Sequence, residues 1–407
     1  MEARVDASRF TRTDVLDLEL YLGDPHPTYT WLRWNSPVHW DDAHGLWVLS
    51  KYQDVVHVSK HPELFCSGKG VRPNSAQMIS IVSTDEPRHG QLRGLVNRGF
   101  TPRMVGLLEP RIREIVKQSI DAVAPHGHCD FVRDLAVDLP LLMIAEMLGI
   151  HPKDRARFHE WSDTMIAAGV DNPEPEVTSK AITAFREFAA YLTAVFEDRR
   201  REPKEDLVSV LVAARDEGVL ASDEETMSND ELVMFMTLLL VAGNETTRNA
   251  LSGGMIALMQ NPAERAKLCA RPELVPTAVE EIVRWVSPVI NFTRTVTRDT
   301  ELGGRKLRAG DPVLLLYPSA NRDEDQFEEA DRFKVDRAPN DHIGFGIGNH
   351  FCLGANLARL ELRMMLSELL RRLPDMELAP GSAPVYASSS FVRGITHLPV
   401  VFTPAPL

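Results

Sequence analysis

The sequence predicts a mainly α-helical protein with a minor β-sheet, an α+β protein. Three observations support this prediction. Several long segments repeat apolar residues with helical periodicity, alternating apolar segments are few and short, and the composition is that of a folded protein. The chain has 407 residues, of which 44% are hydrophobic and 25% are charged. Because no convincing linker interrupts it, we expect residues 1–407 to form one domain.

Charge and cysteine content narrow the class of protein further. The 45 Lys and Arg residues are outnumbered by 58 Asp and Glu residues, which argues against nucleic-acid binding. No C-x-x-C pair occurs, so we expect neither a clustered zinc site nor a disulfide framework, and the cysteines suit a cytoplasmic protein. The longest apolar stretch, Leu232–Gly243, is about half of the roughly 20 residues that a membrane-spanning helix needs, so we expect no integral membrane anchor.

The first half of the chain predicts a hairpin followed by helices. A hairpin with its turn at Ala43–Gly45 is expected within residues 37–56 and leads into a short helix. The proline and acidic content of residues Gly169–Val177 predicts a loop there. Helical periodicity marks residues 105–120, 136–148 and 180–200.

The second half contains the clearest helix. Ser228 and Glu231 form a capping-box pattern, and no helix breaker follows until Pro262, which predicts a helix of about thirty residues. After it we expect a helix over 276–286 and strands within 289–319 with a turn at Ala309–Gly310. An irregular stretch over 320–343 and a glycine-rich loop over 344–354 should follow, and this loop opens a helix that ends near residue 374.

The segment FGIGNHFCLG, residues 345–354, carries the strongest functional signal. Its glycines allow close approach of a bulky group, and Cys352 lies just before a predicted helix, whose N-terminus favours a thiolate. A thiolate on haem iron favours cleavage of the O–O bond. For an isolated cysteine, a buried structural role would be the better interpretation. That interpretation leaves the fixed Phe, Gly and Cys spacing unexplained.

The pattern F-G-x-G-x-x-x-C-x-G resembles the haem-binding loop of the cytochrome P450 family, and Cys352 matches the iron ligand of that loop. Other landmarks follow in the order of the family, so the resemblance covers essentially the whole chain. It implies the P450 fold, a triangular helical body around a buried haem b, and a monooxygenase that uses O2. The haem would also be bordered by Ala242, Phe345, Gly346 and Gly354.

The segment AGNETT, residues 242–247, lies within the long predicted helix. Gly243 is costly in a helix, and the hydroxyl of Thr246 can bond to the carbonyl of Ala242, so we expect a groove wide enough for dioxygen. The resemblance implies that Glu245 and Thr246 are the acid–alcohol pair that delivers protons to the dioxygen. Taken alone, they could equally be a solvated acid and a tolerated threonine.

Two further sets of residues match positions of the family. Glu281 and Arg284 would form a buried structural pair joined by Arg337, although an E-x-x-R pair taken alone is more often a surface pair. Arg and His side chains are suited to the haem propionates. The residues that match these propionate partners are His89, Arg93, Arg294 and His350.

Electrons for a monooxygenase must come from another protein, because the chain shows no G-x-G-x-x-G opening a βαβ unit and no flavin-binding segment. The resemblance implies a ferredoxin and a ferredoxin reductase, supplied ultimately by NAD(P)H. A small acidic ferredoxin needs a basic face, since the net charge of this chain is −13. Such a face, or merely a solvated one, is offered by Arg359, Arg363, Arg371 and Arg372.

The substrate is expected to be hydrophobic. AGNETTRNALSGG resembles the actinobacterial subgroup that hydroxylates the sterol side chain of cholesterol or cholest-4-en-3-one at C26/C27 and can continue to the acid. A branched-chain fatty acid or related lipid is the alternative substrate. The segments that would face the substrate are almost entirely apolar, although each residue alone could be core. They are Ile79, Ile81, Val82, Leu238, Val241, Val289, Ile290, Asn291, Phe292, Phe391 and Val392.

Other classes of function remain open at this point. A peroxygenase or a haem-based sensor needs no proton-delivery pair, and a sterol carrier needs no iron ligand. A cysteine hydrolase that uses Cys352 and His350 would lack an orienting third group. Whether the expected loop over residues 166–178 closes over a substrate is also left open.

Overall fold

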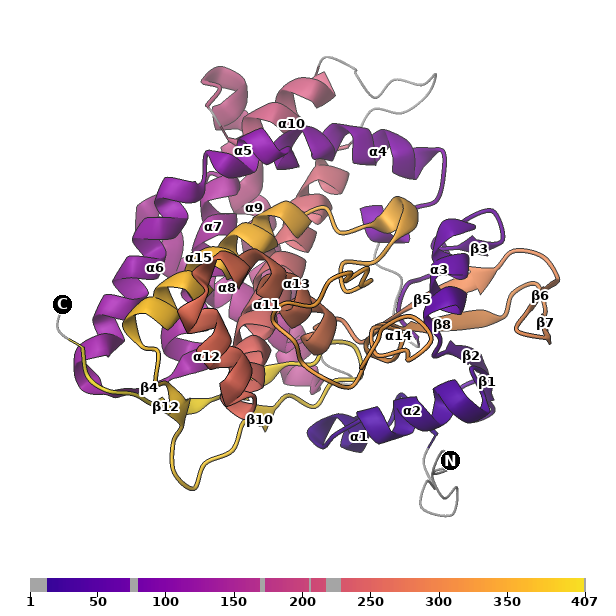
Figure 1. Cartoon of the computed structure of the whole chain (residues 1–407). Helices are drawn as coiled ribbons and strands as arrows, with labels where there is room; N and C mark the ends of the chain where they lie inside the picture. Colours follow the sequence, from indigo (N-terminus) through magenta and orange to yellow (C-terminus); the bar gives the residue numbers. More distant parts are fainter. Residues whose placement is uncertain (1–12, 74–79, 169–172, 205, 217–227, 406–407) are drawn as a thin grey trace.

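The computed structural model describes residues 13–73, 80–168, 173–204, 206–216 and 228–405. Figure 1 shows a body of packed helices with the largest sheet and helix α2 at one side of it. The helices of the described residues are α1 (Leu18–Leu22), α2 (His26–Asn35), α3 (Tyr52–Lys60), α4 (Arg88–Val96), α5 (Pro102–Gly106), α6 (Glu109–Val123), α7 (Asp138–Met147), α8 (Arg155–Ala167), α9 (Pro175–Arg201), α10 (Leu207–Asp216), α11 (Asn229–Gln260), α12 (Pro262–Ala270), α13 (Val275–Val286), α14 (Tyr317–Ala320) and α15 (Ala355–Arg372).

The largest sheet has five strands in the order β1-β2-β8-β5-β3. The predicted hairpin is confirmed, with Val38 paired to Leu49, and β2 pairs in parallel with β8. The strands are β1 (Val38–Asp41), β2 (Leu46–Leu49), β3 (Phe65–Cys66), β4 (His128–Asp130), β5 (Asn291–Val296), β6 (Thr300–Leu302), β7 (Arg305–Leu307), β8 (Pro312–Leu316), β9 (Glu377–Leu378), β10 (Val385–Tyr386), β11 (Ile395–His397) and β12 (Pro399–Val401).

Alternation along β8 divides the core around this sheet. Val313 and Leu315 belong to one core cluster, whereas Leu314 and Leu316 belong to another that includes residues of α2. Successive side chains of a strand point to opposite faces, so β8 is covered on both sides. A third and much larger cluster fills the helical body.

Helix α11 runs through the helical body. The predicted capping box is confirmed, because the Ser228 hydroxyl accepts from the Glu231 N–H and the Glu231 carboxylate accepts from the Ser228 N–H. The helix contacts α7, α13 and α15. It therefore lies against the helix that follows the cysteine loop.

Most of the other predicted elements are also confirmed. The predicted helix over 276–286 is α13, the stretch over 320–343 is irregular after the short α14, and the helix after the cysteine loop is α15. The predicted C-terminal boundary of the loop over residues 169–177 is wrong. Helix α9 begins at Pro175, because proline is well tolerated in the first turn of a helix, and residues 169–172 lie outside the described part of the chain.

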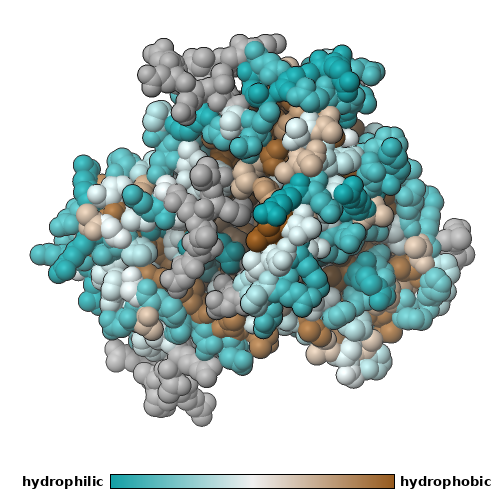
Figure 2. Space-filling model, turned by 180° about the vertical axis from the view of Figure 1, so that it is seen from behind, coloured by the Kyte–Doolittle hydropathy of each residue, from teal (hydrophilic) through white to brown (hydrophobic). Residues whose placement is uncertain are grey.

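The described helices include none that is long and apolar enough to cross a membrane. Figure 2 shows the opposite face of the molecule, where hydrophilic side chains dominate and hydrophobic ones are seen mainly in the recesses between them.

Candidate active site around Cys352

The cysteine loop is folded tightly in front of α15. The N–H of Cys352 donates to the carbonyl of Phe345 at 2.8 Å, which closes the loop over Gly346 and Gly348. Both glycines have positive φ, at 69° and 77°. A Cβ at Gly348 would lie 2.4 Å from the carbonyl oxygen of Ser59, so only glycine fits at that position.

Cys352 itself is partly buried and precedes the first turn of α15. Burial raises the pKa of the Cys352 thiol, whereas the N–H of Gly354 and the cations of Arg93 and Arg359 act in the opposite direction. A buried thiol surrounded by these groups is suited to bind a metal ion, because a metal ligand must be deprotonated. The donor set at this position therefore fits the iron of a haem.

Next to Cys352 lies a group of cationic and imidazole side chains. Arg93 donates to the carbonyl of Phe351, and the rings of His89 and His350 are 4.2 Å apart. The buried Nε2 of His89 has no hydrogen-bond partner among the described residues. Burial, with the neighbouring Arg294, His89 and Arg93 acting in the same direction, lowers the pKa of His350 to about 3.

Arg294 on β5 completes this group. Its side chain is buried and donates to the carbonyl of Thr293, and neither Arg294 nor Arg93 forms an ion pair with any described residue. Burial lowers the pKa of Arg294. A buried cation without an ion-paired carboxylate is unfavourable, so Arg294 and Arg93 fit an anionic ligand such as the propionates of a haem.

Across α11, Thr246 forms the back-bond that its spacing predicts. Its hydroxyl donates to the carbonyl of Ala242 at 2.7 Å. Ala242 is exposed although it lies in the middle of α11, so the small side chain faces open space.

Glu245 lies in a partly buried, charged environment. Burial raises the pKa of Glu245, and the cations of Arg248 and Arg72 act against this rise. Nη2 of Arg248 lies 3.9 Å from Oε1 of Glu245. Arg72 in turn lies over the ring of Phe391, 4.3 Å from its centre. Arg72 was not singled out by the sequence analysis, because its proximity to Glu245 depends on the fold, whereas Arg248 lies three residues after Glu245 on the same helix.

Gly243 has a different role from the one expected. A Cβ at this position would lie 2.7 Å from Cδ1 of Ile144 on α7. Its missing side chain therefore permits close packing of α7 against α11 and does not by itself open the expected groove.

Glu281, Arg284 and Arg337 are brought together in the core. Oε2 of Glu281 accepts from Nε of Arg284 at 2.7 Å and from Nε of Arg337 at 3.0 Å. Glu281 and Arg284 are fully buried. Both arginines also donate to main-chain carbonyls between residues 321 and 332, so the three residues hold the irregular stretch in place.

The residues that we expected to face the substrate differ in how deeply the structure buries them. Ile79 lies outside the described residues. Ile290 directly precedes β5 and packs in the core cluster that includes α2, whereas Val289 and Phe292 pack against the other cluster beside the sheet. Ile81, Asn291 and Val392 are buried. Those that remain partly exposed are Val82, Leu238, Val241, Val289, Phe292 and Phe391, of which the last two are in edge-to-face contact.

The expected basic face on α15 is largely neutralised. Arg359 forms an ion pair with Glu280, Arg371 with Glu368 and Arg372 with Asp121. Arg363 has no ion pair with a described residue. Glu280 was missed by the sequence analysis, although it directly precedes Glu281. It also accepts from His342, and these contacts lower the pKa of Glu280, against its burial, to about 2.

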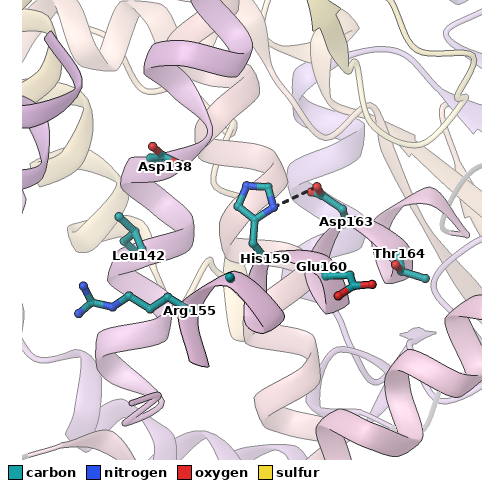
Figure 3. Close-up of a pocket in the computed structure, with 8 residues that line it drawn as sticks. Asp138, Leu142, Arg155, His159, Glu160, Asp163 and Thr164 are labelled. Atoms are coloured by element: carbon teal, nitrogen blue, oxygen red, sulfur yellow. Dashed lines mark ion pairs between the residues drawn. The ribbon is translucent and has the colours of Figure 1, made fainter. Parts of the chain in front are cut away.

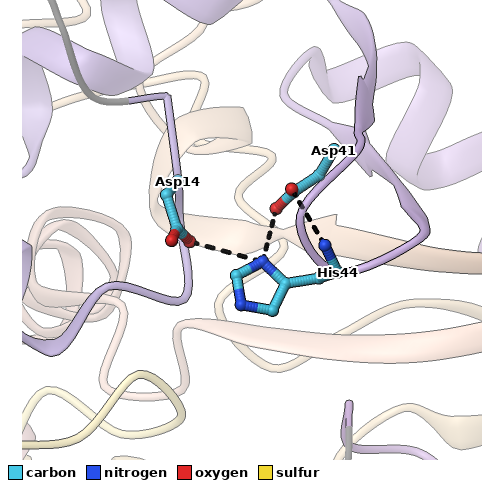
Figure 4. Close-up of side chains that lie close together, drawn as sticks. All are labelled: Asp14, Asp41 and His44. Carbon is cyan, nitrogen blue, oxygen red and sulfur yellow. Dashed lines mark hydrogen bonds and ion pairs between the residues drawn. The ribbon is translucent and has the colours of Figure 1, made fainter.

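Two clusters elsewhere involve none of the predicted site residues. A surface pocket of about 640 Å³ lies between α7 and α8, where His159 forms an ion pair with Asp163 and faces Asp138 (Figure 3). Near the N-terminus, Asp14, Asp41 and His44 lie together (Figure 4). Nδ1 of His44 is 2.9 Å from Asp41 and 3.6 Å from Asp14. A hydrogen bond donated by the imidazole accounts for this cluster without a metal ion.

Comparison with known proteins agrees with this geometry. Residues 172–395 match the family model of cytochrome P450. The chain is 42% identical over 97% of its length to a steroid C26-monooxygenase of Mycobacterium tuberculosis, of which it covers 98%. It is 41% identical over 89% of its length to a methyl-branched lipid omega-hydroxylase of Mycobacterium bovis, of which it covers 85%.

Solved structures show the same likeness. CYP109E1 from Bacillus megaterium, solved in complex with corticosterone, superposes with a TM-score of 0.85 at 35% identity, and the match covers 95% of this chain and 99% of that one. The chain matches the family model and resembles a curated monooxygenase over nearly its whole length. It therefore belongs to the cytochrome P450 family, and it is a P450 monooxygenase.

Proposed function

We propose that this P450 monooxygenase hydroxylates the terminal C26/C27 position of the side chain of cholesterol or cholest-4-en-3-one and continues the oxidation to the acid. The observation that carries this proposal is the 42% identity to a steroid C26-monooxygenase over 97% of the chain. The apolar character of the partly exposed residues Val241, Val289, Phe292 and Phe391 supports a hydrophobic ligand.

The cofactor in this proposal is haem b. When bound, the haem supplies the activation of dioxygen and the insertion of one oxygen atom into a C–H bond. Cys352 would hold its iron, and the propionates would be held by His89, Arg93, Arg294 and His350. Ala242 would leave space for the haem, and Phe345, Gly346 and Gly354 would border it.

The residues of α11 would handle protons. The Thr246 hydroxyl donates to the carbonyl of Ala242, so its oxygen keeps lone pairs that can accept a further hydrogen bond. Glu245 is partly buried and close to Arg248, so it can take up a proton from solvent and release it inward. We assign proton delivery to this pair and a structural role to Glu281, Arg284 and Arg337.

The electron donor in this proposal is a ferredoxin, reduced by a ferredoxin reductase and NAD(P)H in the cytoplasm. Because most of the arginines of α15 are already paired, the basic contacts must come from elsewhere. Arg98 and Arg103 are exposed beside α4 and α5, and neither forms an ion pair with a described residue. Leu107, which directly follows α5, and Phe351 of the cysteine loop are exposed apolar side chains. We assign ferredoxin docking to Arg98, Arg103 and Arg363.

A second candidate is the ω-hydroxylation of methyl-branched lipids. It is favoured by the 41% identity to the methyl-branched lipid omega-hydroxylase, which is nearly as high as the identity to the steroid enzyme. Arg72 on the ring of Phe391 would suit a lipid that carries a carboxylate better than a neutral sterol.

An optical titration of the ferric protein separates these candidates. The sterol proposal expects a saturating low-spin to high-spin shift with cholest-4-en-3-one, followed by a C26-hydroxylated product in the presence of ferredoxin and reductase. A spin-state shift with a methyl-branched fatty acid but not with the sterol would favour the lipid as the substrate.

A substitution tests the enzyme class itself. Cys352→Ala should abolish the haem–thiolate spectrum, whereas sterol binding that is unaffected by this change would favour a carrier.

A further inference from the structure

Asn249 lies one helical turn after Glu245, on the same side of α11. Its side chain is fully buried. The Oδ1 atom accepts a hydrogen bond of 3.1 Å from the N–H of Ile395 on β11, so the orientation of the amide is fixed by the main chain. The NH2 group therefore points away from Ile395, and it has no acceptor among the described residues.

Gly394 shows where this NH2 group lies. A Cβ built on Gly394 would be 3.8 Å from Nδ2 of Asn249 and also 3.8 Å from Oε1 of Glu245. A donor without an acceptor and a carboxylate oxygen thus border the same point, and the absence of a side chain at Gly394 keeps this space open. The Nε atom of Arg248 is also buried without a partner among the described residues.

Buried polar groups of this kind normally have a hydrogen-bond partner, and an ordered water is the usual one where protein groups do not suffice. We propose that Asn249 is a positioning residue for Glu245, whose carboxyl group it holds through one water molecule bound beside Gly394. This inference rests on the proposed role of Glu245 in proton delivery. It adds the residue that would orient the carboxyl group and the point at which a proton would reach it.

The proposal has a defined electrostatic consequence. The charged groups that face Glu245 are Arg248 on α11 and Arg72 on the segment before α4. A donor that reaches the carboxylate stabilises its charged form in addition to these two cations. Loss of the Asn249 NH2 group, or of the water, should therefore raise the pKa of Glu245.

The test is an infrared titration of the haem-loaded protein, in which the Glu245 carboxyl band is identified by its loss in Glu245→Gln. Asn249→Leu keeps the volume but removes the donor. Gly394→Ala, combined with Ala387→Gly because the two Cβ atoms would otherwise be 3.0 Å apart, fills the space but keeps the bond from Asn249 to Ile395. Both variants should shift the titration midpoint upward by about one pH unit.

Asn244→Leu is the matched control. Asn244 is equally buried on α11, but its Nδ2 donates to the hydroxyl of Ser162 at 2.9 Å. It should lose stability without moving the midpoint. An unchanged midpoint in Asn249→Leu or in the Gly394 variant would overturn the proposal, and so would an equal shift in Asn244→Leu. Should Asn249→Leu not fold, the Gly394 variant decides alone.

A second measurement separates this inference from the function on which it rests. The pH dependence of ferredoxin-driven turnover should move in the same direction as the infrared midpoint in both variants. If the infrared midpoint shifts but Glu245→Gln leaves coupled turnover unchanged, the pairing with Asn249 stands and the role of Glu245 in proton delivery fails.

Discussion

Arg359 forms a two-point ion pair with Glu280, in which Nε lies 2.7 Å from Oε1 and Nη2 lies 2.8 Å from Oε2. The same guanidinium lies over the ring of Phe345, 4.5 Å from its centre. The pair thus ties α13 to α15 directly behind the cysteine loop. A side chain used in this way is poorly placed to bind a partner protein, and its position leads to the first prediction.

Arg359→Met should loosen the cysteine loop and leave ferredoxin binding nearly unchanged. Because both side chains are partly exposed, the expected loss is about 1–2 kcal/mol of unfolding free energy. Urea unfolding and the rate of haem loss to apomyoglobin measure these effects. Normal stability with a raised KM for ferredoxin would instead assign Arg359 to docking.

The same pair should make stability depend on pH. The contacts with His342 and Arg359 lower the pKa of Glu280, against its burial, from an ordinary 4.5 to about 2. A depressed carboxyl pKa contributes stability above the pKa of the unfolded state, and this contribution is lost as the pH falls toward the folded value. The difference in unfolding free energy between the wild type and Glu280→Gln should be constant near pH 7 and shrink between pH 4.5 and 2. A difference that does not change over this window would contradict the assignment.

Glu281→Ala should cost far more than the loss of a surface pair. It would leave Arg284 and Arg337 buried without their carboxylate, which typically costs about 3–5 kcal/mol. Glu368→Ala removes an ion pair with the exposed Arg371 and serves as the control, with an expected loss below about 1 kcal/mol. Chemical denaturation of both variants measures the two losses of unfolding free energy. Similar losses would contradict the prediction that the buried trio contributes more to stability than a surface ion pair.

Thr246→Ala should uncouple electron consumption from hydroxylation. Loss of a group that positions a proton typically costs about 100-fold or more, so product per NADH should fall steeply while hydrogen peroxide release rises. Thr246→Ser keeps the hydroxyl that donates to Ala242 and should restore most of the coupling. Full coupling in Thr246→Ala would exclude the hydroxyl from proton delivery.

Reversing the charges of Arg98 and Arg103 should weaken the interaction with ferredoxin. Exposed charges at the rim of an interface act mainly on association, so the KM for ferredoxin should rise by about tenfold at low salt and less at high salt. Arg371→Glu is the control, since Arg371 is already paired with Glu368. Equal effects of all three substitutions would point to net charge and not to a docking site.

The helices and the cysteine loop were predictable because their signals are local. The capping box of Ser228 and Glu231, the bond from Thr246 to Ala242 and the glycine spacing before Cys352 each involve residues a few positions apart. The start of α9 at Pro175 was missed for a local reason too, since proline can either end a loop or begin a helix.

Contacts between distant segments could not be derived in this way. Ile290 and Phe292 look alike in a strand pattern, yet one packs in the core cluster that includes α2 and the other beside Phe391. Likewise, Arg359 and Arg363 share a helix, but only Arg359 meets Glu280. An arginine count on a helix does not tell which charges are already neutralised.

The sequence by itself determined the class of fold, the cysteine that would bind iron and the acid and alcohol on α11, because these depend on residue type and short spacing. Only the tertiary structure decided what surrounds them. It placed Gly243 against Ile144, Arg72 near Glu245, and the NH2 group of Asn249 beside Gly394. The physical reason is that packing joins residues far apart in the chain, and burial then sets their charge and hydrogen bonding.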